Sequence, residues 1–179
     1  MSEFQPPVII PAAAIADRVD ELARRISNDH AGVENLLMVG VLRGSYMFLA
    51  DLTRRLTVPC SVDFISLSEY DRGNLPAGSV RLAMDLRVDI KGRHVVLVED
   101  IVSSGCTLAY LVRNFELREP ASVRTCVLVR KRGHEHVAVR LDYVGFEIPD
   151  RWVVGYGLDY DNKYRNFPYI GVVHTPDPD

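Results

Sequence analysis

The sequence predicts an α/β fold with a mainly parallel twisted sheet flanked by helices, a small hood subdomain and a mobile lid loop. Apolar runs of strand length alternate along the chain with segments whose apolar residues recur at helical spacing. This alternation is typical of a parallel sheet covered by helices. Segments near the polar loop at residues 68–79 and in the C-terminal half are expected to pair antiparallel and to form the smaller subdomain.

The individual elements follow from local signals in chain order. Pro11 opens a helix that is expected to continue to about residue 28. The apolar stripe of this helix is formed by Ile15, Val19, Leu22 and Ile26. A second helix is expected at residues 46–56, and a third after residue 107. Strands are expected at residues 36–41, 62–67, 80–86, 95–98, 123–129, 143–146 and 168–173.

Length and composition limit the classes of protein to which this chain can belong. The 179 residues, 47% of them hydrophobic, fit one domain over residues 1–179, with a tail at 175–179 expected to be disordered. A net charge of −3 gives no overall basic surface for nucleic acid. No apolar run reaches the roughly 18 residues of a membrane span, and the N-terminus lacks the features of a signal peptide. Three widely spaced cysteines fit a reducing compartment, so we expect a cytoplasmic protein that binds neither nucleic acid nor membranes.

The chain is organised around residues 94–111, HVVLVEDIVSSGCTLAYL. An apolar strand leads to the adjacent acids Glu99 and Asp100, and then to a turn of small residues before a helix. Ligands of open α/β sheets bind at such strand ends, and Gly105 permits the backbone angle of an anion-binding nest. The alternative is that Ser103 and Ser104 only cap the helix. The acid pair favours a site, because adjacent carboxylates repel each other and usually need a cation or hydrogen-bond donors.

The segment VVLVEDIVSSGCTL resembles the phosphoribosyl-diphosphate (PRPP) signature of the type I phosphoribosyltransferases, and in detail their hypoxanthine-guanine branch. The segments LRGS, RKRG, FEIPDRWVVGYGLDY and YRNFPYIGVV extend the resemblance, in the same order, over roughly residues 8–173. The resemblance implies the type I phosphoribosyltransferase fold. It also implies purine salvage, in which Mg²⁺-dependent transfer of the phosphoribosyl group from PRPP to hypoxanthine or guanine gives IMP or GMP and pyrophosphate.

The resemblance further implies a role for each part of the site. The 5′-phosphate would bind in the loop formed by Ser103, Ser104, Gly105, Cys106 and Thr107. Pyrophosphate would be bound by Arg43, Gly44 and Arg165. The purine would be bound by Lys131, Trp152, Val153 and Asp159. The catalytic positions would be Ser103, Glu99 and Asp100, and Mg²⁺ would be held by Glu99, Asp100 and Asp159. The lid at residues 68–79 would act through Glu69 and Tyr70.

Local sequence alone leaves alternatives open for these residues. Arg43, Arg165 and Lys131 could each be solvated surface charges. Trp152 could be packed in the core rather than stacked on a purine. The loop at 68–79 could be an ordinary hairpin tip. If Lys131 faces the purine, its ammonium favours a 6-oxo group over the 6-amino group of adenine, which is itself a donor.

Two positions depart from the family pattern. Ser103 stands where the family has the aspartate that accepts a proton from the purine nitrogen, and a serine hydroxyl is a poor base near neutral pH. Three explanations stay open: a reduced rate, a proton accepted by water or by nearby Asp100 or Glu99, or a deliberate replacement of the residue. Glu69 stands beside Tyr70 in place of the family's serine, and its charge would repel pyrophosphate unless the side chain turned away.

These departures keep a second class of function open, a non-catalytic regulator on the same fold that binds a purine nucleotide or PRPP. The expected partners are PRPP and a 6-oxopurine base. Members of the family commonly form dimers or tetramers, so the resemblance also implies a homodimer or homotetramer.

Overall fold

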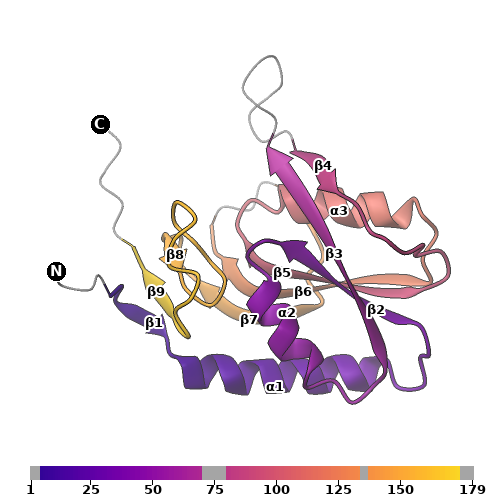
Figure 1. The fold of residues 1–179 in the computed structure, drawn as a ribbon, viewed down its shortest axis with the longest axis horizontal. Helices are drawn as coiled ribbons and strands as arrows, with labels where there is room; N and C mark the ends of the chain where they lie inside the picture. Colours follow the sequence, from indigo (N-terminus) through magenta and orange to yellow (C-terminus); the bar gives the residue numbers. More distant parts are fainter. Residues whose placement is uncertain (1–4, 70–79, 134–136, 174–179) are drawn as a thin grey trace.

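Two sheets organise the chain in the computed structural model, which describes residues 5–69, 80–133 and 137–173. Most of the expected lid, including Tyr70, and the expected disordered tail at 175–179 lie outside the described residues. The larger sheet is a mostly parallel α/β sheet, as the sequence predicts, and the smaller one forms a hood at one end of it (Figure 1).

The direction in which the chain winds through the main sheet reverses between two central strands. Its members are β2 (Leu36–Leu42), β3 (Cys60–Glu69), β4 (Val80–Met84), β5 (His94–Val102), β6 (Ser122–Lys131) and β7 (Tyr143–Ile148). They lie in the order β4-β3-β2-β5-β6-β7, with β4 antiparallel to β3 and every other pair parallel. The chain thus winds outward from β2 in one direction to β3 and in the other to β5. Sheets of this order bind ligands outside the carboxyl ends of the strands at the reversal, which here are the ends of β2 and β5.

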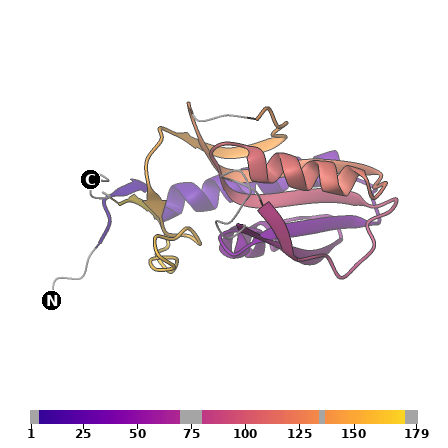
Figure 2. The ribbon, with the colours of Figure 1, turned by 90° about the horizontal axis from the view of Figure 1, so that it is seen from above.

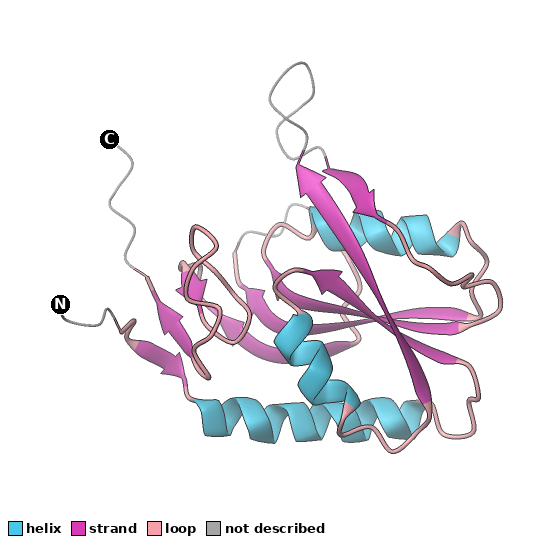
Figure 3. Ribbon diagram, viewed as in Figure 1, coloured by secondary structure: helices cyan, strands magenta, loops and turns pink. Residues whose placement is uncertain are grey.

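Helices cover both faces of the main sheet and create a core on each (Figure 3). The first face carries α1 (Ala12–Asp29) and α2 (Tyr46–Thr53), and the second carries α3 (Cys106–Glu116). The apolar stripe predicted for the first helix is buried, which confirms that prediction. β2 is buried from Leu36 to Val41, as expected for a central strand covered on both faces. None of the described helices has the length and apolarity needed to cross a membrane.

The hood is a three-stranded antiparallel sheet that joins the two ends of the chain. It contains β1 (Val8–Ile10), β8 (Val153–Val154) and β9 (Ile170–Val172), in the order β1-β9-β8. Figure 2 shows it set beside the main sheet, connected to it through the start of α1 and the segment after β7.

Several expectations from sequence need correction. β5 does not end before the acids but continues through Glu99 and Asp100, because its pairing with β6 extends to Val102 and Arg130. The strand β4 joins the main sheet, not the small subdomain. The hood instead contains β1. The sequence did not predict this strand, because its apolar run has only three residues. The second helix ends at Thr53, three residues earlier than expected.

Removal of a large core side chain from the buried face of α3 tests this packing. Phe115→Ala is expected to lower the free energy of unfolding by about 3–5 kcal/mol, because the side chain is fully buried and the cavity would not refill. Leu117→Ala, two residues on and 78% exposed, is the control and should change stability by less than about 0.5 kcal/mol. Urea unfolding measures both, and equal losses would contradict the assignment of the α3 face to the core.

Candidate active site

The loop that follows β2 touches the carboxyl-terminal part of β5 at the reversal of the main sheet. Gly44, after β2, lies so close to the Asp100 carboxylate that a Cβ on this glycine would overlap the carboxylate oxygen Oδ2. The peptide bond between Leu42 and Arg43, at the start of the same loop, is cis. Two segments predicted separately from sequence, one for pyrophosphate and one for ribose or metal, are therefore neighbours in space.

The small-residue turn after β5 forms a phosphate-sized hollow. A cavity of about 180 Å³ lies over it, lined by Glu99, Ile101, Val102, Ser103, Ser104, Gly105, Thr107 and Leu108. Gly105 begins α3 with a left-handed φ of 80° and no side-chain cap. The Cys106 backbone N–H donates to the Ser104 hydroxyl at 3.3 Å. The first-turn amides of a helix lack partners within the helix and carry its positive dipole end, so this hollow is suited to an anion.

Of the two acids before this turn, Glu99 is held away from water and Asp100 is partly buried. Glu99 is buried, and its Oε2 has no hydrogen-bond partner among the described residues. Burial, and then the charge of neighbouring Asp100, raise the pKa of Glu99 well above its ordinary value. Burial also raises the pKa of Asp100, although the charge of nearby Arg165 acts in the opposite direction. An unpartnered buried carboxylate oxygen of this kind is suited to a hydroxyl donor or a cation from a ligand.

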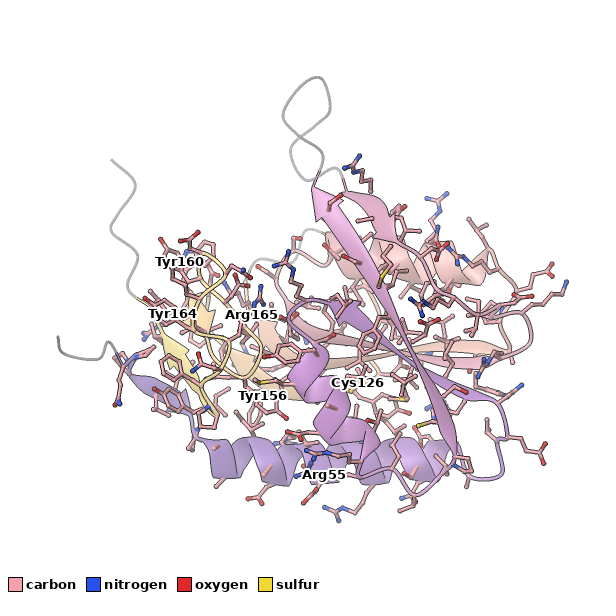
Figure 4. All side chains as sticks on the ribbon, in the orientation of Figure 1. Arg55, Cys126, Tyr156, Tyr160, Tyr164 and Arg165 are labelled. Carbon is pink, nitrogen blue, oxygen red and sulfur yellow. The ribbon has the colours of Figure 1, made fainter. Side chains whose placement is uncertain are left out.

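Two arginines from distant parts of the chain converge on one oxygen. Arg43 Nη1 donates to Asn162 Oδ1 at 3.2 Å, and Arg165 Nη2 donates to the same oxygen at 3.2 Å. Arg165 also donates to the Gly157 carbonyl at 2.7 Å and pairs with Asp159 at 2.8 Å. Figure 4 shows Arg165 on the hood side, directed toward the end of the main sheet. Both arginines thus face one region beside Asp100, as a pyrophosphate clamp requires.

The hood is fixed against this region by a tyrosine between two glycines. The Tyr156 hydroxyl donates to Asp51 Oδ2 at 2.6 Å, joining the hood to α2 (Figure 4). Gly157 follows with φ of 99°, and a Cβ there would overlap the Gly44 carbonyl oxygen. The hood therefore packs directly on the loop after β2, and a larger residue at position 157 would push the two apart.

Lys131 and Trp152, both predicted to bind the purine, lie close to each other. Lys131 is the last residue of β6, not part of the following turn, and its side chain is 13% exposed. Its Nζ lies 3.0 Å from Asp150 Oδ1 and 5.5 Å from the centre of the Trp152 ring. Trp152 is 56% exposed and meets Tyr160 edge to face, so the core-packing alternative for this residue is wrong. Its neighbour Val153 is buried at the start of β8.

The structure gives less direct evidence for the roles predicted for Asp159 and Glu69. Asp159 is occupied by Arg165 and by the Asn162 backbone N–H at 2.7 Å. Across the described ranges no three His, Cys, Asp or Glu side chains form a metal-binding group, so Asp159 does not join Glu99 and Asp100 in one cluster. Glu69 ends β3, where its backbone pairs with Val80.

Two residues of the site were missed by sequence reasoning. Asn162 bridges the arginines, and nothing in the sequence around it indicated this role; its left-handed φ of 58° is a conformation that asparagine tolerates. Asp150, which follows β7, pairs with Lys131 at the end of the neighbouring strand β6, and its place after Pro149 indicated a turn but not a partner.

An anion-binding turn, an adjacent acid pair and converging arginines at the reversal of a doubly wound sheet define an α/β protein that binds phosphate esters. A family model for the phosphoribosyl transferase domain matches residues 9–161. The chain belongs to the phosphoribosyl transferase domain family.

Individual relatives agree with this family over most of their length. The chain is 45% identical to a hypoxanthine phosphoribosyltransferase of Salmonella typhimurium, covering 93% of this chain and 94% of the relative. It is 44% identical to a hypoxanthine-guanine phosphoribosyltransferase of Mycobacterium tuberculosis, covering 93% and 85%. The solved hypoxanthine phosphoribosyltransferase of Trypanosoma cruzi, in complex with the product IMP, superposes with a TM-score of 0.89 at 40% identity and covers 97% of both chains.

The burial of Glu99 predicts a dependence of stability on pH. Because its pKa is raised in the folded protein, the folded state holds this proton more tightly than the unfolded chain, and stability falls as pH rises from the ordinary value of 4.5 through the raised pKa. In metal-free buffer, Glu99→Gln is therefore expected to be more stable than the unmodified protein at about pH 8, with the difference shrinking toward about pH 4.

Urea unfolding across this pH range measures the effect. Glu116→Gln, an exposed change on α3, is the control and should show no such difference. A stability difference that does not vary with pH would contradict proton uptake by Glu99.

Proposed function

We propose that this protein is a purine-salvage enzyme that transfers the phosphoribosyl group of PRPP to hypoxanthine or guanine, giving IMP or GMP and pyrophosphate. The observation that carries the proposal is the convergence of Arg43 and Arg165 beside the acid pair and the anion-binding turn. The relatives named above are transferases of this kind. The alternative of a non-catalytic regulator has no support among them.

Each part of the site has a task in this reaction. The turn from Ser103 to Thr107 holds the 5′-phosphate, and the clamp of Arg43, Gly44 and Arg165 holds pyrophosphate. The bond from ribose C1 to the pyrophosphate oxygen breaks, a bond to the purine nitrogen forms, and that nitrogen loses its proton. Positive charge develops on the ribose in the transition state, as in glycoside chemistry. The arginines stabilise the negative charge of the leaving pyrophosphate.

Lys131 and Trp152 are proposed to bind the purine. Trp152 offers an exposed ring face for stacking, which contributes roughly 1–3 kcal/mol per base. Lys131 pairs with Asp150, which leaves two of its three ammonium donors for a 6-oxo group. Val153 would meet the base edge through its backbone, and Asp159 lies on the Arg165 side of the same region.

Mg²⁺ is the proposed cofactor, and the residues present fit it. Mg²⁺ usually binds through one or two carboxylates together with substrate phosphates, so a site with fewer than three protein acids is suitable. The unpartnered Glu99 Oε2 and the adjacent Asp100 are the two carboxylates that would hold it, whereas Asp159, which pairs with Arg165 outside this cluster, would not join them. When bound, the ion neutralises charge on the pyrophosphate.

The remaining parts of the proposal are the cellular compartment, the oligomeric state and the lid. We propose a cytoplasmic homodimer or homotetramer, and an apolar hollow of about 440 Å³ between α1, α2 and the hood is a candidate surface for contact between subunits. Its lining includes Met47, Ala50 and Phe167, and Tyr46 at its rim is exposed. The lid proposed for residues 68–79, with Glu69 and Tyr70, would exclude water during transfer.

Pyrophosphate release with PRPP, Mg²⁺ and each of hypoxanthine, guanine, xanthine and adenine tests the function. Turnover with hypoxanthine or guanine and none with adenine is expected, because the Lys131 ammonium cannot accept a hydrogen bond from a 6-amino group. Arg165→Gln should lower turnover and weaken PRPP binding, whereas Arg113→Gln on the exposed side of α3 should not. Binding of IMP without turnover of any base would favour the regulator instead.

Ser103 gives a second, sharper prediction for the same assay. Ser103→Asp is expected to raise kcat by about tenfold or more, because a positioned general base contributes about 10²–10⁴-fold. Ser103→Asn, of similar shape but without a basic carboxylate, is the control and should not raise it. An unchanged kcat in the aspartate variant would show that another group or water already takes the proton efficiently.

A further inference from the structure

A segment behind the phosphate-binding turn supports it from outside the site. We call residues 137–142, which lead into β7, the strap. At its first residue, the Val137 backbone N–H donates to the Ser104 carbonyl at 3.1 Å. On the same side, a Cβ added to Gly105 would lie 2.6 Å from the Val137 carbonyl oxygen. The strap thus occupies the space directly behind the turn and bonds to its backbone.

The other end of the strap is fastened to β6 by a network centred on Thr125. The Thr125 hydroxyl donates to the Arg140 carbonyl at 2.8 Å and accepts from the Asp142 backbone N–H at 3.1 Å. The Thr125 backbone N–H donates to Asp142 Oδ2 at 2.9 Å. Thr125 is buried, and the Asp142 side chain is 7% exposed. Buried bonds that satisfy every group in this way hold a segment in one position.

Apolar packing along the middle of the strap does not hold it in place as the hydrogen bonds at its ends do. Val139 and Leu141 rest against the core on the α3 face, but a cavity of about 320 Å³ remains between the strap, Val102, Gly105 and Arg130. Closely packed side chains fix one another's positions through contact, and a cavity between them removes those contacts. The hydrogen bonds at the two ends of the strap therefore control where it lies.

We propose that Thr125 and Asp142 are positioning residues for the 5′-phosphate site and act on it through the strap. Thr125 lies in β6 and Asp142 directly precedes β7, and neither lines the cavity over the phosphate-binding turn. Loss of the anchor would let the strap shift and would leave the Ser104 carbonyl and the turn without support. This inference rests on the proposed function, because it assigns the supported turn to the phosphate of PRPP and IMP.

Binding of IMP and of inosine to the full-length protein tests the proposal, since the two ligands differ only in the 5′-phosphate. Thr125→Val keeps the side-chain shape but removes the hydroxyl, and is expected to weaken IMP binding about five- to tenfold, as expected for roughly 1–1.4 kcal/mol of lost positioning. Inosine binding should stay unchanged. In kinetics, KM for PRPP should rise while KM for hypoxanthine does not.

Two further variants separate positioning from stability. Thr125→Ser keeps the hydroxyl and should restore IMP binding. Tyr143→Phe removes a hydroxyl that contacts Asp29 and Arg124, one residue beyond the strap, and should lower stability without changing the ratio of IMP to inosine affinity.

The proposal is overturned if Thr125→Val weakens IMP and inosine equally, or if it lowers the melting temperature as Tyr143→Phe does while leaving IMP binding intact. Failure of the unmodified protein to bind IMP would overturn the proposed function itself, a result distinct from both.

Discussion

The contact between Gly44 and the Asp100 carboxylate is the constraint on which the rest of the site depends. It arises because β2 and β5 are adjacent and parallel, so their carboxyl ends reach the same edge where the winding of the sheet reverses. Gly157 then packs on the Gly44 carbonyl and brings the hood into the same stack. Two backbone segments and the Asp100 side chain approach one another so closely that Gly44 and Gly157 have no room for a side chain. The geometry of the candidate site is therefore set by one close contact of backbone with backbone and one of backbone with a carboxylate.

Such packing leaves Glu99 buried and Asp100 partly buried, and this has an energetic cost in the absence of ligand. Burial raises the pKa of both Glu99 and Asp100, and one Glu99 oxygen remains without a partner. A ligand that brings hydroxyls or a cation relieves that cost when it binds. Proteins commonly accept this kind of local instability at functional sites, since the same groups that destabilise the free protein bind the ligand. The described part of the chain shows no comparable unpartnered carboxylate elsewhere.

Much of this organisation could be predicted from sequence because local pattern determines it. The buried run of β2, the stripe of α1 and the turn at Gly105 are each recognisable from adjacent residues. What could not be predicted depends on partners far apart in the chain. β1 has three residues and becomes a strand only because β9 lies beside it, and β5 extends through its acids only because β6 continues to pair with it. Arg43, which contacts Asn162, and the partners of Asp150 and Thr125 likewise lie 15 or more residues away, and no local signal identifies them.

The arginines illustrate how a chain of net charge −3 can bind a highly charged anion. Arg165 is held by a carbonyl, an amide oxygen and one carboxylate, and Arg43 by the same amide oxygen. A neutral amide oxygen orients both guanidinium groups without cancelling their charge, and a single carboxylate cancels at most one. The pair therefore keeps net positive charge, on Arg43, which is exposed, and on Arg165, whose side chain is 20% exposed. Affinity for a diphosphate then depends on local placement rather than on overall charge, which explains why the net charge of the chain said nothing about PRPP.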